Sequence, residues 1–572
     1  MSAAATISGK ELGIHLGFPR ASIAGLPVLQ HAEFGKDIVY DLQNAEKAGE
    51  KRPDTYITLG RLYDMGRPTE KRVTLDKENL VRHAFVTGTT GSGKSTTVYK
   101  MLTELHQIGI PFLVVEPAKG EYKDEFGNWP GVKVFSTNPS IAPLLQLNPF
   151  EFPESIHVLE HIDGLVEIFN ACWTMYDAMP ALFKKAILRS YESIGWDLCS
   201  SVFEGRGKKY PSFQILVDQL IVLIDESGYS AEVKSNYRGA LVTRAESLTV
   251  GLNKLIFTDE RTPYRDLFDR NCILDISRMK SMETKSLIMG LMVYILNEYR
   301  MHQKTGSDES LKHVTVLEEA HNLLKNTSMG QSSELVRKSV EMLTQTIAEI
   351  RTYGESFIIV DQSPSSVDIA AIKNTNTKII HQTLEVNDRE TVGRSIGLDD
   401  DQMNEISKLP TGVAVVYQND WMKPVLTKVE RQKYKTKSAY INKEPEKVKL
   451  QREVRTELIS VLMQPWLKRA RIRSRELEED LRLADLRPAD LKKIRKYADY
   501  YTSHRGSMRW EEADIPKLRD CLKAVLQISE KEMIAFSAAE DDGEVLQKAV
   551  RNKTEGFSDR EIEEICFRLS KI

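Results

Sequence analysis

The middle of the chain alternates short apolar segments with longer segments in which apolar residues recur at helical spacing. The apolar segments are rich in β-branched residues and are apolar at consecutive positions, as in strands buried on both faces. They read RHAFVTG (82–88), IPFLVVEP (110–117), VKVFS (132–136), CILDIS (272–277), VTVLEE (314–319), SFIIVDQ (356–362), TKIIHQT (377–383) and GVAVVYQ (412–418). This alternation predicts an α/β core with a mainly parallel sheet covered by helices on both sides.

The same patterning divides the chain into three regions. Residues 1–79 contain Gly, Pro and short extended pieces, and predict a small β-rich N-terminal region. Residues 80–435 form the predicted α/β core, in which 151–250 has almost no strand signal and predicts a helical insertion. Residues 440–572 are rich in Lys, Glu, Leu and Arg and predict a separate helical domain, where Ser558 and Glu561 have the spacing of a capping box.

Composition narrows the class of protein without changing this architecture. The 572 residues are 41% hydrophobic and 28% charged, which is typical of a soluble globular protein. The net charge of -3 argues against a general polyanion-binding surface, so any contact with nucleic acid is expected to be local. The five cysteines form no CxxC pair, and no apolar run approaches the roughly 18 residues of a membrane span. We therefore expect a cytoplasmic protein with no membrane attachment.

The strongest chemical signal is the segment GTTGSGKS at 88–95, which follows an apolar strand and precedes a helical segment. In this context glycines let successive backbone N–H groups converge on phosphates at a helix N-terminus. The pattern predicts an ATP-binding phosphate loop in which Lys94 reaches the β- and γ-phosphates and the Ser95 hydroxyl ligates Mg²⁺. The nucleotide-binding residues expected here are Gly88, Thr89, Thr90, Gly91, Ser92, Gly93, Lys94, Ser95 and Thr96.

Two adjacent acids, Glu318 and Glu319, end the strand VTVLEE. Ligands of parallel sheets bind at the carboxyl ends of the strands, so both side chains are expected at the nucleotide. Glu318 is predicted to be a Mg²⁺ ligand, direct or through water, and Glu319 the general base that activates water. The alternative is a solvated acidic pair that merely ends a strand.

Two further residues have a chemical and a plain structural interpretation. Gln362 ends the next strand, where its amide could sense the γ-phosphate or the attacking water, or could simply bond a loop. Arg351 closes an amphipathic helix just before Tyr353 and Gly354. It is either an arginine finger that reaches the nucleotide of a neighbouring subunit or a cation that complements the helix dipole.

Taken together, GTTGSGKS, LVVEPAKGEY, LNPFEFPE, LEEAHNLL and IRTYGESFIIVDQSPS resemble, in this order, the HerA-like ATPases of the FtsK/HerA superfamily of DNA translocases. The resemblance covers roughly residues 10–430. It implies a RecA-like P-loop fold, with Lys94, Glu319, Gln362 and Arg351 as catalytic residues and Arg82 as a second arginine near the nucleotide. It further implies ATP with Mg²⁺, a homohexamer, and double-stranded DNA in the ring pore. The N-terminal region is short for the family's β-barrel, which we expect to be reduced.

The resemblance also implies a partner. Relatives act beside an effector, a nuclease or a sirtuin-like NADase, and some belong to anti-phage defence. The leading expectation is therefore an ATP-hydrolysing double-stranded DNA translocase or helicase that works with such an effector. The alternatives are a hexameric scaffold whose ATP turnover regulates the effector, and a conjugation or secretion ATPase. Candidate DNA contacts, each more simply a surface cation, are Lys119, Lys123, Lys325, Arg337 and Lys338.

Overall fold

The fold is built on one large sheet. The computed structural model describes residues 31–36, 55–173, 175–205, 209–259, 261–303, 310–327, 333–431, 439–442, 444–467, 469, 472–538 and 543–570. The strands are β1 (Tyr56–Asp64), β2 (Arg67–Asp76), β3 (Ala84–Thr87), β4 (Phe112–Glu116), β5 (Lys133–Ser136), β6 (Trp196–Asp197), β7 (Val202–Phe203), β8 (Cys272–Asp275), β9 (His313–Glu318), β10 (Glu355–Asp361), β11 (Thr377–Ile380), β12 (Val413–Gln418) and β13 (Val425–Val429).

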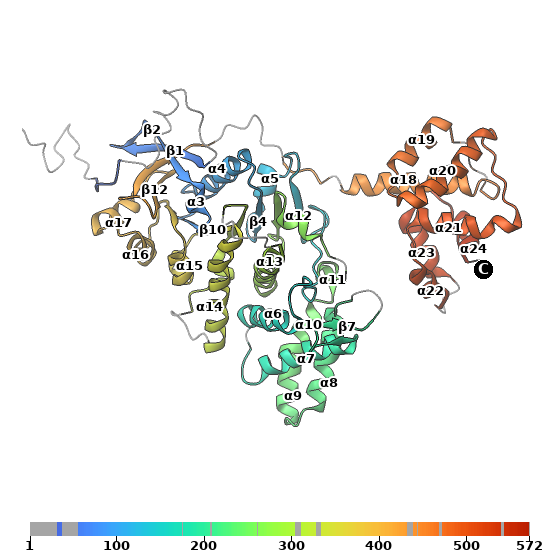
Figure 1. Ribbon diagram of the computed structural model, residues 1–572, viewed down its shortest axis with the longest axis horizontal. Coiled ribbons are helices and arrows are strands. Elements are labelled where there is room, and N and C mark those ends of the chain that lie inside the picture. The colour runs from blue at the N-terminus through green and yellow to red at the C-terminus, as the bar shows by residue number, and fades with distance from the viewer. Residues whose placement is uncertain are drawn as a thin grey trace, which may run out of the picture. The chain divides into compact units, whose positions relative to one another are not determined.

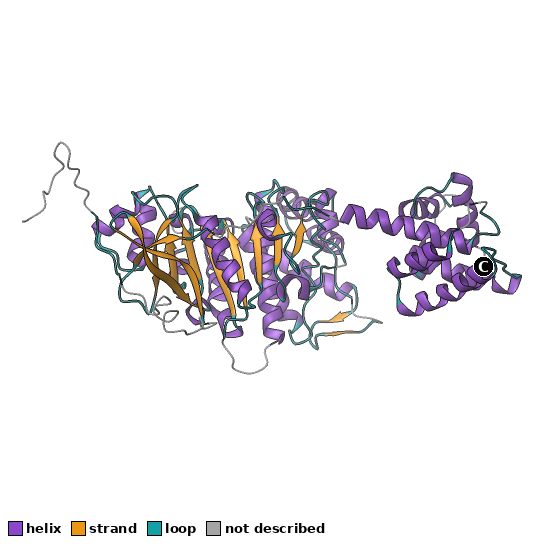
Figure 2. Ribbon diagram, turned by 90° about the horizontal axis from the view of Figure 1, so that it is seen from above, coloured by secondary structure: helices purple, strands orange, loops and turns teal. Residues whose placement is uncertain are grey.

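Eleven of these strands form the sheet, in the order β2-β1-β13-β12-β11-β3-β10-β9-β4-β8-β5. Figure 2 shows the strands side by side, with helices around them. The strands from β11 to β5 are all parallel. The RecA-like, parallel-rich α/β fold predicted from the sequence is therefore confirmed. The segment GVAVVYQ does form β12, but β12 runs antiparallel to β11 and begins an antiparallel edge that continues through β13, β1 and β2.

Helices cover both faces of this sheet, as the uninterrupted apolar strands require (Figure 1). Along β4 the side chains alternate between two cores: Val114 packs with α4 and α5, whereas Leu113 and Val115 pack with α6, α13 and α14. The helices of this unit are α3 (Lys77–Leu80), α4 (Lys94–Gln107), α5 (Tyr122–Phe126), α6 (Val158–Cys172), α7 (Met179–Ser193), α8 (Phe213–Glu226), α9 (Ala231–Tyr237), α10 (Thr243–Ser247), α11 (Gly251–Ile256), α12 (Tyr264–Phe268), α13 (Met282–Gln303), α14 (Glu334–Glu349), α15 (Ile369–Lys373), α16 (Val386–Ser395) and α17 (Asp400–Ile406).

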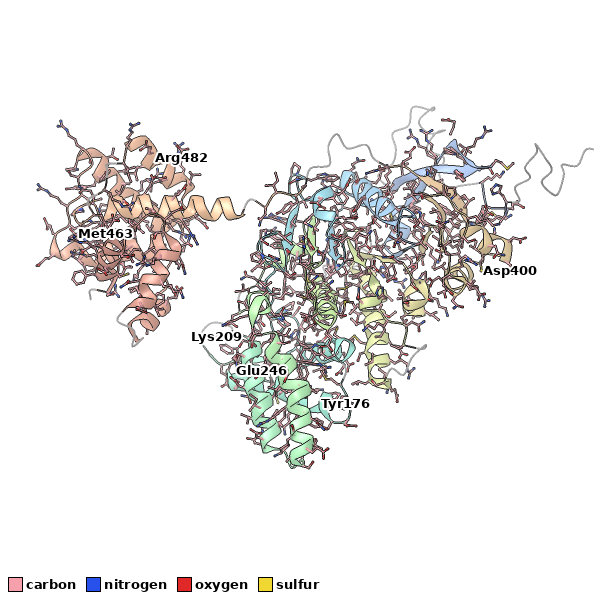
Figure 3. All side chains as sticks on the ribbon, turned by 180° about the vertical axis from the view of Figure 1, so that it is seen from behind. Tyr176, Lys209, Glu246, Asp400, Met463 and Arg482 are labelled. Carbon is pink, nitrogen blue, oxygen red and sulfur yellow. The ribbon has the colours of Figure 1, made fainter. Side chains whose placement is uncertain are left out.

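Between β5 and β8 the chain forms α6 to α11, and α6 to α10 lie within residues 151–250, where the sequence predicts a helical insertion. Figure 3 labels Tyr176, Lys209 and Glu246 within it. This region also contains the small antiparallel hairpin of β6 and β7, which was not predicted because each strand has only two residues. Its aromatic side chains, including Phe152, Phe169 and Phe213, belong to the same core as one face of the sheet. The insertion is therefore packed into the α/β unit.

The described part of the N-terminal region continues the sheet. β1 is paired with β13 on one side and with β2 on the other, and Gly35 bridges to Val425. No structural break separates these strands from the core at residue 79. The reduced barrel stays a prediction, because residues 1–30 and 37–54 lie outside the described residues.

A second unit comprises residues 442–572. The regular elements of its described part are all helices, and it has its own apolar core, which includes Met463 (Figure 3). Ser558 and Glu561 form the predicted capping box: the Glu561 carboxylate accepts from the Ser558 N–H at 2.8 Å and the Ser558 hydroxyl accepts from the Glu561 N–H at 3.4 Å. The helices are α18 (Glu444–Leu462), α19 (Ser474–Leu483), α20 (Pro488–Ser503), α21 (Ile515–Leu526), α22 (Glu530–Ala538), α23 (Glu544–Lys553) and α24 (Asp559–Ser570).

Over the described ranges, none of the helices has the length and apolarity that crossing a membrane requires.

Candidate nucleotide-binding and hydrolysis site

The loop 88–95 joins the end of β3 to the start of α4, as the motif predicts. Gly88, Gly91 and Gly93 have φ values of 146°, 80° and 122°, which residues with a Cβ rarely adopt. Gly88 is also sterically required, because an added Cβ would lie 2.5 Å from the His381 Cβ. Behind the loop, the Gly412 N–H donates to the Ser92 carbonyl at 2.7 Å. The segment before β12 therefore holds one side of the loop. The other side is open toward the carboxyl edge of the sheet.

A cavity of about 200 Å³ lies on that open side. The Lys94 ammonium is folded against the loop and donates to the carbonyls of Gly88 and Thr89, the latter at 3.1 Å. The cavity residues come from the phosphate loop and the start of α4, from the end of β4 and the segment after it, from the ends of β9 and β10, and from the segment before β12. They are Thr90, Gly91, Gly93, Lys94, Ser95, Thr96, Glu116, Ala118, Lys119, Glu121, Tyr122, Glu318, Glu319, Gln362 and Thr411.

A chain of hydrogen bonds links the phosphate loop to the acid strand. The Thr90 hydroxyl donates to the Gln362 Oε1 at 2.6 Å, and the Gln362 Nε2 donates to the Glu319 Oε1 at 2.5 Å. Gln362 therefore accepts and donates at once, as a glutamine sensing both phosphate and water would. Glu319 itself has a left-handed backbone, with φ 48° and ψ 53°. Such a conformation costs about 1–3 kcal/mol in a non-glycine residue and often marks a functional position.

Glu318 lies beside Glu319, at the last position of β9. Its carboxylate accepts from the Tyr122 hydroxyl, and burial raises the pKa of Glu318 to about 7. The neighbouring negative charge of Glu319 raises it further, whereas the Tyr122 hydrogen bond and the Lys94 ammonium oppose the shift. A cation bound nearby would favour the charged form.

The residues present fit a magnesium ion. Ser95 and Glu318 line the same cavity, together with the carboxylates of Glu116 and Glu319, so the donors are all hard oxygens of the kind Mg²⁺ prefers. Within the described part of the chain, the Ser95 side chain makes no hydrogen bond, which leaves its hydroxyl available as a ligand. The assignment of Ser95 and Glu318 as metal ligands stays a prediction.

Two features of the site were not predicted from the sequence. The buried Asp361 carboxylate accepts from the backbone N–H and the Nδ1 of His321, at 2.8 and 2.9 Å, and from the Ser363 N–H. This pair joins the ends of β9 and β10 next to Glu319, whose Oε2 lies 3.6 Å from the His321 Nδ1. Glu116, at the end of β4, is the second: burial raises the pKa of its carboxyl to about 8. The His321–Asp361 pair could have been suspected only by knowing that β9 and β10 are neighbours.

The two predicted arginines lie elsewhere. Arg351 is in the 3-10 turn Ile350–Tyr353, which Gly354 ends with a φ of 78°, and Arg82 lies just before β3. Both precede their strands and are therefore at the amino edge, whereas the phosphate loop is at the carboxyl edge. At about 3.3 Å per residue, the seven residues of β10 alone separate Arg351 from the cavity by about 20 Å. The structure thus gathers the other predicted residues around one loop and leaves Arg82 and Arg351 outside that site.

Replacing Glu318 by Gln should stabilise the protein at alkaline pH. Burial raises the pKa of Glu318 from its ordinary 4.5 to about 7. Between these two pH values the folded state therefore holds a proton that the unfolded state has lost. Stability therefore falls as the pH rises from about 4.5 to about 7, and the full cost, about 3 kcal/mol, is present above that range. We expect Glu318→Gln to gain about 1–3 kcal/mol at pH 8 and much less at pH 5, measured by denaturation without nucleotide.

The matched control is Glu334→Gln, since Glu334 is an exposed residue that pairs with Lys338 on α14. The free energy of unfolding of this control should not increase at either pH. Equal changes in the free energy of unfolding at pH 5 and pH 8 for Glu318→Gln would contradict the burial of an ionisable group at this position.

Comparisons with known proteins agree with this geometry. The family model described as "Helicase HerA, central domain" matches residues 57–198. The protein named DNA double-strand break repair helicase HerA from Sulfolobus acidocaldarius is 25% identical over 392 residues, covering 66% of this chain and 69% of that protein. The protein of the same name from Sulfurisphaera tokodaii is 23% identical over 380 residues, covering 66% of this chain and 69% of that protein.

Among solved structures, VirB4 of Thermoanaerobacter pseudethanolicus superposes with a TM-score of 0.51 at 17% identity, covering 66% of this chain and 97% of that one. This likeness concerns the fold. The family match begins at β1 and includes the phosphate loop, and the two HerA sequences each align over 66% of this chain. The match of residues 57–198 to the HerA central domain and the similarity to two HerA helicases support the HerA-like ATPase of the FtsK/HerA superfamily that the motifs predict.

Proposed function

We propose that this protein is a Mg²⁺-dependent ATPase that forms a ring of six subunits and translocates double-stranded DNA. The observation that carries the proposal is the hydrogen-bonded chain from Thr90 through Gln362 to Glu319. It connects the loop that would hold the γ-phosphate directly to the carboxylate that would activate water. A structural acid pair would not need a connection to the phosphate loop.

Each site residue of a subunit has its own role in ATP hydrolysis. Glu319 accepts the proton of the attacking water, and Gln362 orients that water while reporting the state of the phosphate loop through Thr90. Lys94 leaves the carbonyls of Gly88 and Thr89 to bind the β- and γ-phosphates. Ser95 and Glu318 hold magnesium, which when bound neutralises charge on the phosphates.

The position of the arginines supports a ring. Arg351 makes no ion pair or side-chain hydrogen bond with any residue that the structure describes, and the same is true of the Arg82 side chain. Both are exposed at the amino edge of the sheet, too far from their own cavity to act there. In a closed head-to-tail ring the amino edge of one subunit can face the nucleotide of the next, so Arg351 and Arg82 act in trans.

DNA is the proposed cargo because the relatives carry the name helicase HerA. A motor that follows the backbone needs few cations per subunit, since a ring multiplies them, and a net charge of -3 is compatible with that. We further propose that the protein is cytoplasmic and works with a separate effector, a nuclease or a sirtuin-like NADase, in anti-phage defence. The helical unit 442–572 lies beyond the family match and is the proposed docking region.

The test is hydrolysis by the purified protein with and without long double-stranded DNA. We expect DNA to stimulate turnover and the protein to displace a third strand from a DNA triplex in an ATP-dependent manner. Absence of both effects would reject the translocase and favour a conjugation or secretion ATPase or a scaffold. Full effector activity with a Lys94→Ala variant would favour the scaffold, because hydrolysis would then be dispensable.

A further inference from the structure

The loop between β4 and α5, residues 117–121, forms a second wall of the nucleotide cavity, and it is held rigidly. The Glu116 carboxylate accepts from the Glu121 N–H at 2.7 Å and from the Tyr122 N–H at 3.1 Å, which closes the loop over the end of β4. On its other side, the Lys285 ammonium donates to the Pro117 carbonyl at 2.6 Å. The loop is therefore held at both ends, by the side chains of Glu116 and Lys285.

The turn at Gly120 is fixed in the same way. Gly120 has a φ of 71°, and a Cβ at this position would lie 2.7 Å from the Lys123 Nζ and 3.0 Å from the Asp275 Oδ2. The Lys123 ammonium pairs with Asp275 at 2.9 Å and donates to the Gly120 carbonyl. Lys123, which the sequence offered as a DNA contact, thus has a structural task within its own subunit.

Lys119 is the lysine that this loop leaves free. Its side chain is exposed, lines the cavity with Lys94, Glu318 and Glu319, and makes no ion pair or hydrogen bond with the described residues. Two cations, Lys94 and Lys119, therefore line the same cavity, an arrangement that suits a polyanionic ligand.

The order of the strands places Lys119 across the cavity from Lys94. The neighbours β3, β10, β9 and β4 end respectively in the phosphate loop, Gln362, the two glutamates and the loop of Lys119. A phosphoryl group held near Lys94 and facing the glutamates is therefore approached by Lys119 from the opposite side. Negative charge develops on that phosphoryl group during hydrolysis, and a positioned lysine stabilises it.

We propose that Lys119 is a further catalytic residue, which contacts the terminal phosphate of the bound nucleoside triphosphate from within the same subunit. The inference rests on the proposed ATP hydrolysis at this site but not on DNA translocation. It assigns to Lys119 a task inside the nucleotide site rather than on the DNA. A diphosphate lacks the group that Lys119 contacts, so the residue discriminates ATP from ADP.

The test compares Lys119→Ala with the unaltered protein in the absence of DNA. Affinity for a non-hydrolysable ATP analogue should fall about 10- to 100-fold, because a charge-assisted hydrogen bond is lost, while affinity for ADP changes by less than about twofold. The kcat for ATP should fall as well, and Lys119→Arg should recover part of the triphosphate affinity. Lys254→Ala, which removes an exposed lysine of α11, is the control and should change neither ligand's affinity.

Equal losses for ADP and the ATP analogue would overturn the assignment and indicate a structural role. Unchanged nucleotide affinity and kcat, with more DNA needed for half-maximal stimulation, would overturn it in favour of a DNA contact. Because the binding assay contains no DNA, a failure of the translocase proposal would leave this result interpretable.

Discussion

Replacement of Glu319 by Gln is expected to reduce ATP hydrolysis by about 100-fold or more, since a positioned general base contributes about 10² to 10⁴. The amide cannot take the proton of the attacking water. It can still accept the hydrogen bond from Gln362, and the left-handed backbone at position 319 is no harder for Gln than for Glu. Binding of ATP should therefore persist. Phosphate release and retention of labelled ATP, measured on the same preparation, would separate the two effects.

The control for this prediction is Glu341→Gln, because Glu341 is an exposed carboxylate that pairs with Arg337 on α14. It should hydrolyse ATP at the rate of the unaltered protein. Turnover by Glu319→Gln within about threefold of normal would remove Glu319 from the role of base, and with it the mechanism built on the Gln362 connection. Glu318, the other carboxylate at the end of β9, would then be the candidate for the general base.

The local parts of this arrangement could be predicted from the sequence. The phosphate loop is contiguous, and its glycines and flanking strand and helix determine its shape without help from distant residues. Parallel strands place their ends at one edge, which is why Glu318, Glu319 and Gln362 could be expected together before their contacts were known. Apolar runs such as IPFLVVEP were unambiguous because both faces of their strands are buried.

The parts that depend on neighbours in space could not be predicted. β2 is half solvated and β13 alternates, so neither had the continuous apolar signal of the central strands. The antiparallel direction of β12 depends on the hairpin to β13, and the Asp361–His321 contact depends on the adjacency of β9 and β10. The resemblance to HerA-like ATPases implied that Arg82 lies near a nucleotide, and the length of β3 places it at the opposite edge from its own phosphate loop, so its role at a neighbouring subunit's site stays a prediction.

The second large effect is expected at Arg351. Arg351→Ala should lower hydrolysis by about 100-fold or more, since an arginine finger contributes about 10³ to 10⁵, while ATP binding within each subunit remains. Because Arg351 lies about 20 Å from its own cavity, the defect should be confined to the neighbouring subunit's site. Co-assembly of Arg351→Ala subunits with Glu319→Gln subunits should then restore activity, since a site can pair the intact Glu319 of one with the intact Arg351 of the other. At equal, random mixing about one quarter of the interfaces have this composition.

The matched control mixes Lys94→Ala with Glu319→Gln subunits. Both of these changes affect the same half of a site, so no interface between them contains both an intact phosphate loop and an intact base, and no activity should return. Hydrolysis by the Arg351 mixture that stays at the level of this control would show that Arg351 does not act across an interface. Recovery in the Arg351 mixture alone would require a ring in which the amino edge of one sheet meets the carboxyl edge of the next.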